Sequence, residues 1–268
     1  MRYHVIGLGR WGKHLSRRLA SRGLASVTSQ SAAKVEQLRR EFPSLALRQN
    51  PALASLDQDD MLVLCIPDDA LAAYLADLRK AIDEEVGLPL VVLSAGSASL
   101  EQLRSVYPRI AVLWPIQSFT KNHTPDWVDL PIVCQSVQTD ELPHVLKLAS
   151  LLSERTPILA DRDETRLRLH LCAVLVQNFS NLLWRHAERV LDGTDVHARE
   201  LIPLARTHLS ALQRQSARAL QTGPAARSDQ STLSKHLQLL DELALPDVAN
   251  LYRLASAQIA ALDSDHKA

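Results

Sequence analysis

The first 160 residues alternate short apolar runs with amphipathic segments, as strands and helices do in an α/β domain. The run Met61-Leu62-Val63-Leu64-Cys65-Ile66 is apolar throughout, which is typical of a parallel strand covered on both faces. Further runs predict strands at residues 3–6, 25–29, 90–94, 110–113, 132–134 and 157–159. We therefore expect a doubly wound, mostly parallel sheet with right-handed crossovers, and helices near residues 68–85 and 141–152.

From Asp163 almost to the end of the chain, helical periods replace this alternation and no strand is predicted. The change predicts an α/β domain at residues 1–160 and an all-helical domain at residues 161–268. The first helix of the second domain, residues 164–191, is apolar on nearly every side. Such a helix is normally buried, so we expect it to form the axis of its domain or to lie at a subunit contact.

A glycine-rich turn with the spacing GxGxxG follows the first predicted strand. The first glycine permits a sharp turn, the second lets a pyrophosphate approach the backbone, and the third lets the helix pack on the strand. Free N–H groups at a helix start attract phosphate, so the turn is a candidate dinucleotide site. The predicted cofactor contacts here are Gly7, Leu8, Gly9, Arg10, Trp11 and Gly12. A tight turn without a ligand is the alternative.

The end of the second predicted strand distinguishes the two nicotinamide cofactors. An acidic residue there binds the ribose 2′-hydroxyl of NAD and repels the 2′-phosphate of NADP. This chain instead has Ser29, Gln30 and Ser31, followed by Lys34. Hydroxyls, an amide and a lysine suit a phosphate, so we expect NADP rather than NAD. The alternative is that the two serines only form a loop and a helix N-cap.

Later strand ends extend this predicted cleft, because ligands of doubly wound sheets bind at the carboxyl ends of the strands. Residues 67–69, 94–97 and 114–119 are therefore expected to border it. The remaining predicted cofactor contacts are Ile66, Pro67 and Ala95. A further polar cluster, Lys121, Asn122 and His123, lies at a predicted sheet edge and is either functional or plain surface.

Polar residues interrupt the apolar helix at residues 164–191. In an ideal α-helix, Gln177 and Asn181 fall on the same stripe as His170, with Asn178 to one side. Buried amides and imidazoles need partners, so the stripe requires an explanation. Interhelical hydrogen bonds are one interpretation. The other is a substrate pocket in which His170 transfers a proton and the asparagines Asn178 and Asn181 orient the substrate.

The segment Thr222-Gly223-Pro224-Ala225-Ala226-Arg227-Ser228-Asp229 breaks one helix before the next begins. It is either a helix connection, in which Ser228 or Asp229 caps the following helix, or part of a binding site. In the second interpretation Arg227 binds a carboxylate with both arms of its guanidinium, and Asp229 holds Arg227 in place.

Composition narrows the function classes. Thirty Lys and Arg balance thirty Asp and Glu, so no overall field favours nucleic acid or an anionic membrane. Cys65, Cys134 and Cys172 have neither disulfide nor metal-site spacing, which favours a cytoplasmic setting and no metal. No apolar run approaches the ~20 residues of a membrane span, and the N-terminus does not resemble a signal peptide. The expected partner is a small-molecule substrate.

Five segments together carry a resemblance: GxGxxG at residues 7–12, Cys65-Ile66-Pro67-Asp68, Trp114-Pro115-Ile116-Gln117-Ser118-Phe119, the helix from His170 to Asn181, and residues 222–229. In this order they resemble uncharacterised Rossmann-like proteins whose C-terminal half is a domain of unknown function. That family looks like a branch of the 6-phosphogluconate dehydrogenase-like superfamily, beside pyrroline-5-carboxylate reductase, ketopantoate reductase and deazaflavin-dependent NADP oxidoreductases.

The resemblance implies an α/β fold with an N-terminal NAD(P)-binding Rossmann domain. It also implies a C-terminal all-helical domain like that of 6-phosphogluconate dehydrogenase, which often forms a homodimer, and an active site in the cleft between the domains. Three positions depart from the family pattern. Trp114 replaces the His before Pro115, Leu169 replaces the Tyr before His170, and Ser228 replaces the Gly of Arg-Gly-Asp.

The sequence thus predicts an NADP-dependent oxidoreductase that reduces a small carboxylate-bearing carbonyl or imine compound. His170, nearest to the catalytic lysine of some superfamily members, is the expected proton donor, and Arg227 is expected to bind the carboxylate. The alternative, which Trp114 favours, is an NADP-binding sensor or scaffold without redox turnover. A third interpretation is that no nucleotide binds.

Overall fold

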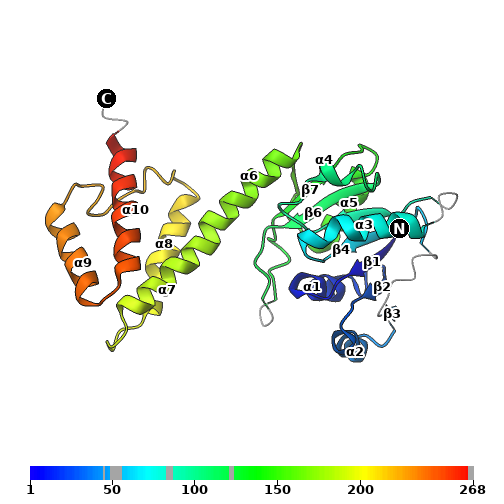
Figure 1. The fold of residues 1–268 in the computed structure, drawn as a ribbon, viewed down its shortest axis with the longest axis horizontal. Coiled ribbons are helices and arrows are strands. Elements are labelled where there is room, and N and C mark those ends of the chain that lie inside the picture. The colour runs from blue at the N-terminus through cyan, green and yellow to red at the C-terminus, as the bar shows by residue number, and fades with distance from the viewer. Residues whose placement is uncertain (45, 49–55, 83–86, 121–123, 265–268) are drawn as a thin grey trace. The chain divides into compact units, whose positions relative to one another are not determined.

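The computed structural model describes residues 1–44, 46–48, 56–82, 87–120 and 124–264. The chain forms two compact units, Met1–Val174 and Leu175–Ala268. The first unit contains the sheet, and the described residues of the second form helices, turns and loops (Figure 1). The division follows Val174, whereas the change of sequence pattern predicts a boundary near residue 160. The first half of the long helix therefore belongs to the α/β unit.

The sheet has eight strands in the order β3-β2-β1-β4-β5-β6-β7-β8. The strands are β1 (Arg2–Ile6), β2 (Leu24–Thr28), β3 (Ala46–Arg48), β4 (Asp60–Leu64), β5 (Leu90–Leu93), β6 (Ile110–Pro115), β7 (Ile132–Ser136) and β8 (Ile158–Leu159). All neighbours pair in parallel except β6 and β7. This arrangement confirms the predicted doubly wound, mostly parallel sheet.

Two details of the prediction differ from the structure. The short edge strand β3 was not predicted, because three residues are too few to show a strand period. The helix predicted at residues 68–85 is shorter and in two parts, the 3₁₀ turn η2 (Asp68–Ala70) and α3 (Leu71–Ala81). Residues 83–86 lie outside the described part of the chain.

Apolar side chains on both faces of the central strands form two cores. Because successive strand residues point to opposite faces, Val63 joins one core while Leu62 and Leu64 join the other. The first core also includes buried residues of α1 (Arg10–Leu19), α2 (Ala32–Glu41) and α5 (Leu142–Leu152). The second includes residues of α3 and α4 (Leu100–Leu103). The continuous apolar runs in the sequence are thus explained by helices on both faces.

The second unit contains α7 (Ser180–Val190), η4 (Ala198–Leu201), α8 (Ile202–Leu212), α9 (Gln230–Glu242) and α10 (Pro246–Ser264). Leu240 of α9 and Ala249 of α10 are buried where these two helices pack. Arg189 pairs with Asp247 at 2.5 Å and thereby links α7 to α10. Among the described residues, no helix combines the length and apolarity that crossing a bilayer requires.

The helical stretch predicted at residues 164–191 is not one regular α-helix. It consists of α6 (Asp163–Ala173), the π-helical turn η3 (Val174–Phe179) and α7. The expected burial along this stretch is also wrong for the single chain, since Leu175, Val176 and Phe179 are 48%, 72% and 52% exposed. The sequence predicted either a domain axis or a subunit contact for this stretch. Because so much apolar surface is exposed, the subunit contact is the explanation to test.

Candidate functional site

The turn between β1 and α1 requires glycine at two positions. Gly7 has φ +101°, and a Cβ there would lie 2.5 Å from the carbonyl oxygen of Cys65. A Cβ on Gly12 would lie 1.9 Å from the carbonyl oxygen of Gly7. The turn therefore packs against Cys65, the residue after β4, and against the start of α1 at distances that any side chain would prevent.

Gly9 is glycine for another reason. It is the N-cap residue of α1 with extended backbone angles, which other residues also adopt. A Cβ there would approach only the Cys65 carbonyl oxygen, at 3.9 Å, so packing within the chain does not demand glycine. The first turn of α1 contains no acidic residue and has no side-chain cap. Bare N–H groups at such a helix start are suited to an anion that approaches the backbone closely.

A cavity of about 520 Å³ lies over this turn, at the carboxyl ends of β1, β2 and β4. Its lining includes eight of the residues predicted to contact the cofactor: Gly7, Leu8, Gly9, Ser29, Gln30, Ser31, Ile66 and Pro67. These residues come from three separate stretches of the sequence. Parallel pairing of the three strands brings them to one edge of the sheet.

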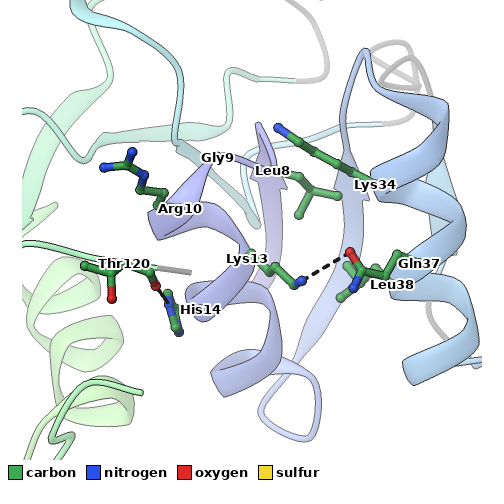
Figure 2. A pocket seen from close by; sticks show the side chains of 9 residues that line it. All are labelled: Leu8, Gly9, Arg10, Lys13, His14, Lys34, Gln37, Leu38 and Thr120. Carbon is green, nitrogen blue, oxygen red and sulfur yellow. Dashed lines mark hydrogen bonds between the residues drawn. The ribbon is translucent and has the colours of Figure 1, made fainter. Parts of the chain in front are cut away.

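An adjoining cavity of about 420 Å³ lies between α1 and α2, and Figure 2 shows its lining. Arg10, Lys13 and Lys34 line it, and among the described residues neither cavity has an acidic lining residue. The Lys13 ammonium donates to the Gln37 side chain at 3.2 Å, and the His14 ring contacts the Thr120 carbonyl oxygen at 3.0 Å. The two cavities share Lys34, so the positive charge also faces the end of β2.

The serines after β2 are not explained by helix capping. Ser31 is the N-cap residue of α2, yet its side chain makes no capping hydrogen bond. The Ser29 hydroxyl accepts a hydrogen bond from the Ser31 amide at 3.3 Å, which shapes the turn. The Ser31 hydroxyl therefore stands beside Lys34 on the wall of the larger cavity without the capping role that would account for it.

Two further hydroxyls line the larger cavity. The side-chain oxygens of Thr28 and Tyr74 are buried and have no hydrogen-bond partner among the described residues. A buried hydroxyl without a partner costs roughly 1–3 kcal/mol. Native structures contain few such groups, so each one needs an explanation.

His170 lies beside the turn that follows β5. Its ring centroid is 5.3 Å from that of Trp114, and a Cβ on Gly96 would lie 2.6 Å from His170 Cδ2. The ring is half-buried on α6. The structure thus places His170, on α6, at the carboxyl ends of β5 and β6. Ala95, Gly96 and Trp114 were expected to border the cleft there.

Arg166, which the sequence reasoning missed, attaches α6 to the same turn. This fully buried guanidinium donates to the carbonyl oxygens of Ala95 at 3.0 Å, Gly96 at 3.2 Å and Ala98. It also donates to the Asp163 carboxylate at 2.7 Å. Arg166 precedes His170 by one helical turn, so it sets where the imidazole lies. An arginine in an apolar segment, three residues after an aspartate, was the available signal.

Asp163 completes this attachment. Its carboxylate accepts hydrogen bonds from the Ser99 hydroxyl at 2.8 Å and the Glu101 amide at 3.1 Å. Burial raises the pKa of Asp163, but hydrogen bonds from Glu101, Ser99 and Arg166 outweigh it and hold the pKa below its ordinary value. The ionised carboxylate therefore balances the charge of the buried Arg166.

Three other predicted cofactor contacts serve the packing of this unit. Trp11 packs on Phe119 with ring centroids 4.5 Å apart and on Trp127 at 6.4 Å. Gly12 packs against the turn, and Ala95 accepts a hydrogen bond from Arg166. None of the three lines either described cavity.

The other predicted catalytic residues belong to the second unit. Asn178 is in η3, Asn181 is in α7, and both side chains are exposed. The π-helical turn adds to the helical repeat, so the stripe calculated for an ideal α-helix does not apply across it. The predicted polar cluster at residues 121–123 lies outside the described residues.

Arg227 is exposed in the connection before α9. Asp229 caps this helix, because its carboxylate accepts from the Thr232 amide at 3.0 Å and the Thr232 hydroxyl at 2.7 Å. The capping interpretation of Asp229 is therefore confirmed. Ser228 has φ +55°, a left-handed conformation that favours glycine, which explains why the family pattern has glycine there.

Comparison with known proteins agrees with the fold. Residues 131–259 match the family model described as "Domain of unknown function (DUF2520)". No curated protein sequence matches the chain. The structure is similar to that of a "putative NADP oxidoreductase" from Bacteroides fragilis, with 26% identity, 97% of this chain and 98% of the other covered, and a TM-score of 0.81.

Two more distant structures show the same fold. The reductive aminase from Aspergillus terreus, solved with NADPH and ethyl levulinate, is 16% identical over 96% of this chain and 94% of its own, with a TM-score of 0.67. The Streptomyces aurantiacus imine reductase is 15% identical over 97% and 96%, with a TM-score of 0.66.

Proposed function

Since this chain resembles the Rossmann-like proteins with a C-terminal domain of unknown function, within the 6-phosphogluconate dehydrogenase-like superfamily, we propose that it is an NADP-dependent oxidoreductase. Its proposed substrate is a small carboxylate-bearing carbonyl or imine compound. The names of the similar structures, an NADP oxidoreductase, a reductive aminase and an imine reductase, support the reaction class.

The observation that carries the proposal is the bare backbone at Gly9. Packing leaves space at this position, the helix start has no side-chain cap, and the cavity above it is lined by the ends of three strands. The residues present therefore fit a dinucleotide, whose pyrophosphate the N–H groups at the start of α1 would hold. The ends of β2 and β4 would bind its adenosine half.

The preference for NADP rests on the end of β2. Ser31 and Lys34 line the larger cavity, and Arg10 and Lys13 add charge nearby. In the part of the chain that the structure describes, no acidic residue lines either cavity. These groups favour a ribose 2′-phosphate over a free 2′-hydroxyl, because charge-assisted hydrogen bonds to phosphate are the stronger ones.

His170 is the proposed proton donor. NADPH, when bound, supplies a hydride. The imidazole lies beside the turn after β5, and Trp114 and Gly96 restrict its ring, so its nitrogen atoms are held at a defined place. Histidine is the side chain that most often transfers a proton in catalysis. In the proposal Asn178 or Asn181 orients the substrate and Arg227 binds its carboxylate.

We further propose that the chain acts as a homodimer in the cytoplasm. Exposed apolar side chains recur along α7, α8 and α10, including Leu183 at 56%, Leu204 at 70% and Leu262 at 69%. A monomer rarely exposes so much apolar surface, whereas a second copy would cover it. Analytical ultracentrifugation should give twice the chain mass, and a monomer at micromolar concentration would contradict the proposal.

A binding and turnover experiment tests the function. NADPH should quench tryptophan fluorescence more tightly than NADH, and 2-keto acids and cyclic imines should then be screened for loss of nicotinamide absorbance. His170→Ala should lower turnover roughly 10²- to 10⁴-fold with little change in NADPH affinity, because general acid catalysis contributes about that factor. His144→Ala, on α5, is the matched control and should leave turnover unchanged. Equal turnover by the His170 variant would remove its role.

Trp114 favours a second candidate function. It occupies the family's histidine position, and its ring contacts His170. A protein that binds NADP as a sensor or scaffold needs the nucleotide site but not proton transfer. Tight NADPH binding with no turnover of any carbonyl or imine in the screen would favour this candidate. Absence of quenching by either cofactor would contradict both.

A further inference from the structure

The hydroxyls of Thr28 and Tyr74 are a feature of the cavity that the glycine turn does not explain. Thr28 ends β2 and is 5% exposed, and Tyr74 lies one turn into α3. Both hydroxyl oxygens are buried and unpartnered among the described residues, and both residues line the 520 Å³ cavity. The chain maintains two desolvated hydrogen-bonding groups beside an open volume.

Their neighbours limit what fits between them. Ile66, Pro67 and Ala70 form an apolar part of the same wall, at the end of β4 and the start of α3. Ser29 and Ser31 lie on the β2 side. If the glycine turn holds a pyrophosphate and the serines face a ribose, the remaining wall has apolar side chains and two hydroxyls. A flat heterocycle with ring nitrogens matches that wall.

We propose that Tyr74 and Thr28 are the polar determinants of a purine nucleoside subsite, in which their hydroxyls hydrogen-bond the adenosine end of the cofactor. This inference rests on the proposed function and names residues that determine affinity at its nucleotide site. Ile66 and Pro67 contact the face of the base. The hydroxyls obtain partners only when the nucleotide is bound, so part of the binding free energy comes from relief of their isolation.

The protonation state of Tyr74 agrees with this role. Burial raises the pKa of its phenol to about 12. The group is therefore a neutral O–H donor throughout the physiological range, which suits the lone pair of a purine ring nitrogen.

Replacement of Tyr74 by phenylalanine has opposite effects on the two states. In the free protein, Tyr74→Phe removes an unsatisfied hydroxyl, so Tm should rise by roughly 2–4 °C. Affinity for NADPH and for adenosine 2′,5′-bisphosphate should fall about 5- to 10-fold, because the bound state loses a hydrogen bond. Affinity for reduced nicotinamide mononucleotide, which lacks adenosine, should not change. Thr28→Val should behave in the same way.

Tyr107→Phe is the matched control. The Tyr107 hydroxyl is also buried, but it donates to the Pro89 carbonyl oxygen at 2.8 Å. Its removal should therefore lower Tm by roughly 2–4 °C and leave nucleotide affinity unchanged. The two tyrosines differ in whether the fold already supplies a partner.

The outcomes separate the subsite from the function. If the wild-type protein binds NADPH but Tyr74→Phe and Thr28→Val bind it equally well, the subsite is wrong and the proposed function stands. If wild-type protein binds adenosine 2′,5′-bisphosphate without NADPH turnover, and the variants lose that binding, the subsite stands and the oxidoreductase proposal does not. A lower Tm for Tyr74→Phe, or binding of neither nucleotide, overturns the subsite.

Discussion

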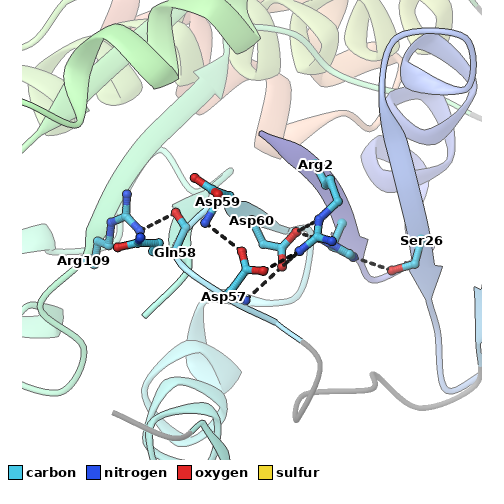
Figure 3. Close-up of polar contacts among 8 residues, drawn as sticks. Arg2, Ser26, Asp57, Gln58, Asp59, Asp60 and Arg109 are labelled. Carbon is cyan, nitrogen blue, oxygen red and sulfur yellow. Dashed lines mark hydrogen bonds and ion pairs between the residues drawn. The ribbon is translucent and has the colours of Figure 1, made fainter. Parts of the chain in front are cut away.

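Polar side chains at the two ends of β1, β2 and β4 differ in whether they have hydrogen-bond partners within the fold. At the amino end, Asp60 binds Arg2, as Figure 3 shows. Asp60 also contacts His4, so the three side chains form one network. At the carboxyl end, the hydroxyls of Thr28 and Tyr74 have no partner among the described residues, and Gly9 leaves N–H groups uncapped. The described polar groups of the amino end find partners within the fold, whereas those of the carboxyl end do not.

Asp60 is the centre of the amino-end network. Its fully buried carboxylate accepts from Arg2 Nε at 2.6 Å, Arg2 Nη2 at 2.8 Å, the Asp57 amide at 3.0 Å and His4 Nε2 at 3.0 Å. His4 Nδ1 contacts the Ser26 hydroxyl at 2.7 Å. In catalytic triads the nitrogen roles are reversed, with Nε2 facing the serine. The row Ser26, His4, Asp60 thus joins three strands and is a structural tie.

The difference between the two ends shows where to look for function in an α/β protein. Hydrogen bonds within the fold account for polar groups that stabilise it, whereas unsatisfied groups beside a cavity indicate a ligand. Both ends contain His, Ser or Tyr side chains, so residue type does not distinguish them. The presence or absence of partners does.

The largest predicted effect concerns the glycines of the carboxyl end. Gly12→Ala places a Cβ 1.9 Å from the Gly7 carbonyl oxygen, so the free energy of unfolding should fall by at least about 3 kcal/mol. Gly9→Ala meets no close atom and should leave that free energy nearly unchanged, yet abolish measurable NADPH binding. Urea denaturation and fluorescence titration measure the two quantities. Full NADPH affinity in the Gly9 variant would show that the turn holds no ligand.

The second prediction concerns the amino end. Asp60→Ala should lower the free energy of unfolding by roughly 2–3 kcal/mol, less than for a fully buried pair because Arg2 is half-exposed. NADPH affinity should be unchanged, since the network is remote from the cavity lining. If Asp60→Ala lost NADPH affinity but kept its free energy of unfolding, the two ends would not differ in the way described.

Acidification should remove the stabilisation that the Asp60 carboxylate provides. Burial raises the pKa of Asp60, but hydrogen bonds from Arg2, the Asp57 amide and His4 together lower it more. The folded pKa therefore lies below the unfolded value of about 3.9, so the stabilisation is present above that pH. It is lost as pH falls through the folded pKa. Unfolding curves of wild-type protein and the Asp60 variant should converge below about pH 4.

The third prediction, with a smaller effect than the first two, concerns charge at the carboxyl end. Lys34→Ala should weaken NADPH about 10-fold, the equivalent of one charge-assisted hydrogen bond, and leave NADH affinity unchanged. Lys80→Ala, an exposed lysine on α3, is the matched control and should change neither. Isothermal titration gives all the affinities. Equal losses for NADPH and NADH would indicate that Lys34 does not face the 2′-phosphate.

Much of the first unit could be predicted because its signals are local. The run at residues 61–66 predicts a buried strand from six adjacent residues, and GxGxxG predicts a turn from six more. The doubly wound, mostly parallel sheet followed from the alternation of strands and helices, which needs only the sequence of elements. The edge strand β3 was missed because three residues carry no periodicity.

The candidate site shows the limit of such local signals. His170 could be singled out as a polar residue in an apolar helix, but Arg166, which positions it, was missed. Its partners Ala95, Gly96 and Ala98 lie about seventy positions earlier in the sequence. Pairings between such distant residues leave no trace in local periodicity.

What the sequence alone determined is the class of fold, the glycine turn and the absence of an acidic residue after β2, because each depends on neighbouring residues. Only the tertiary structure decided which polar groups are satisfied. Among the described residues, the hydroxyls of Thr28 and Tyr74 have no partner, whereas Arg166 is fully paired. Strands and helices from distant positions exclude water around all three groups. Desolvation is a property of the packed chain, and the candidate site is defined by it.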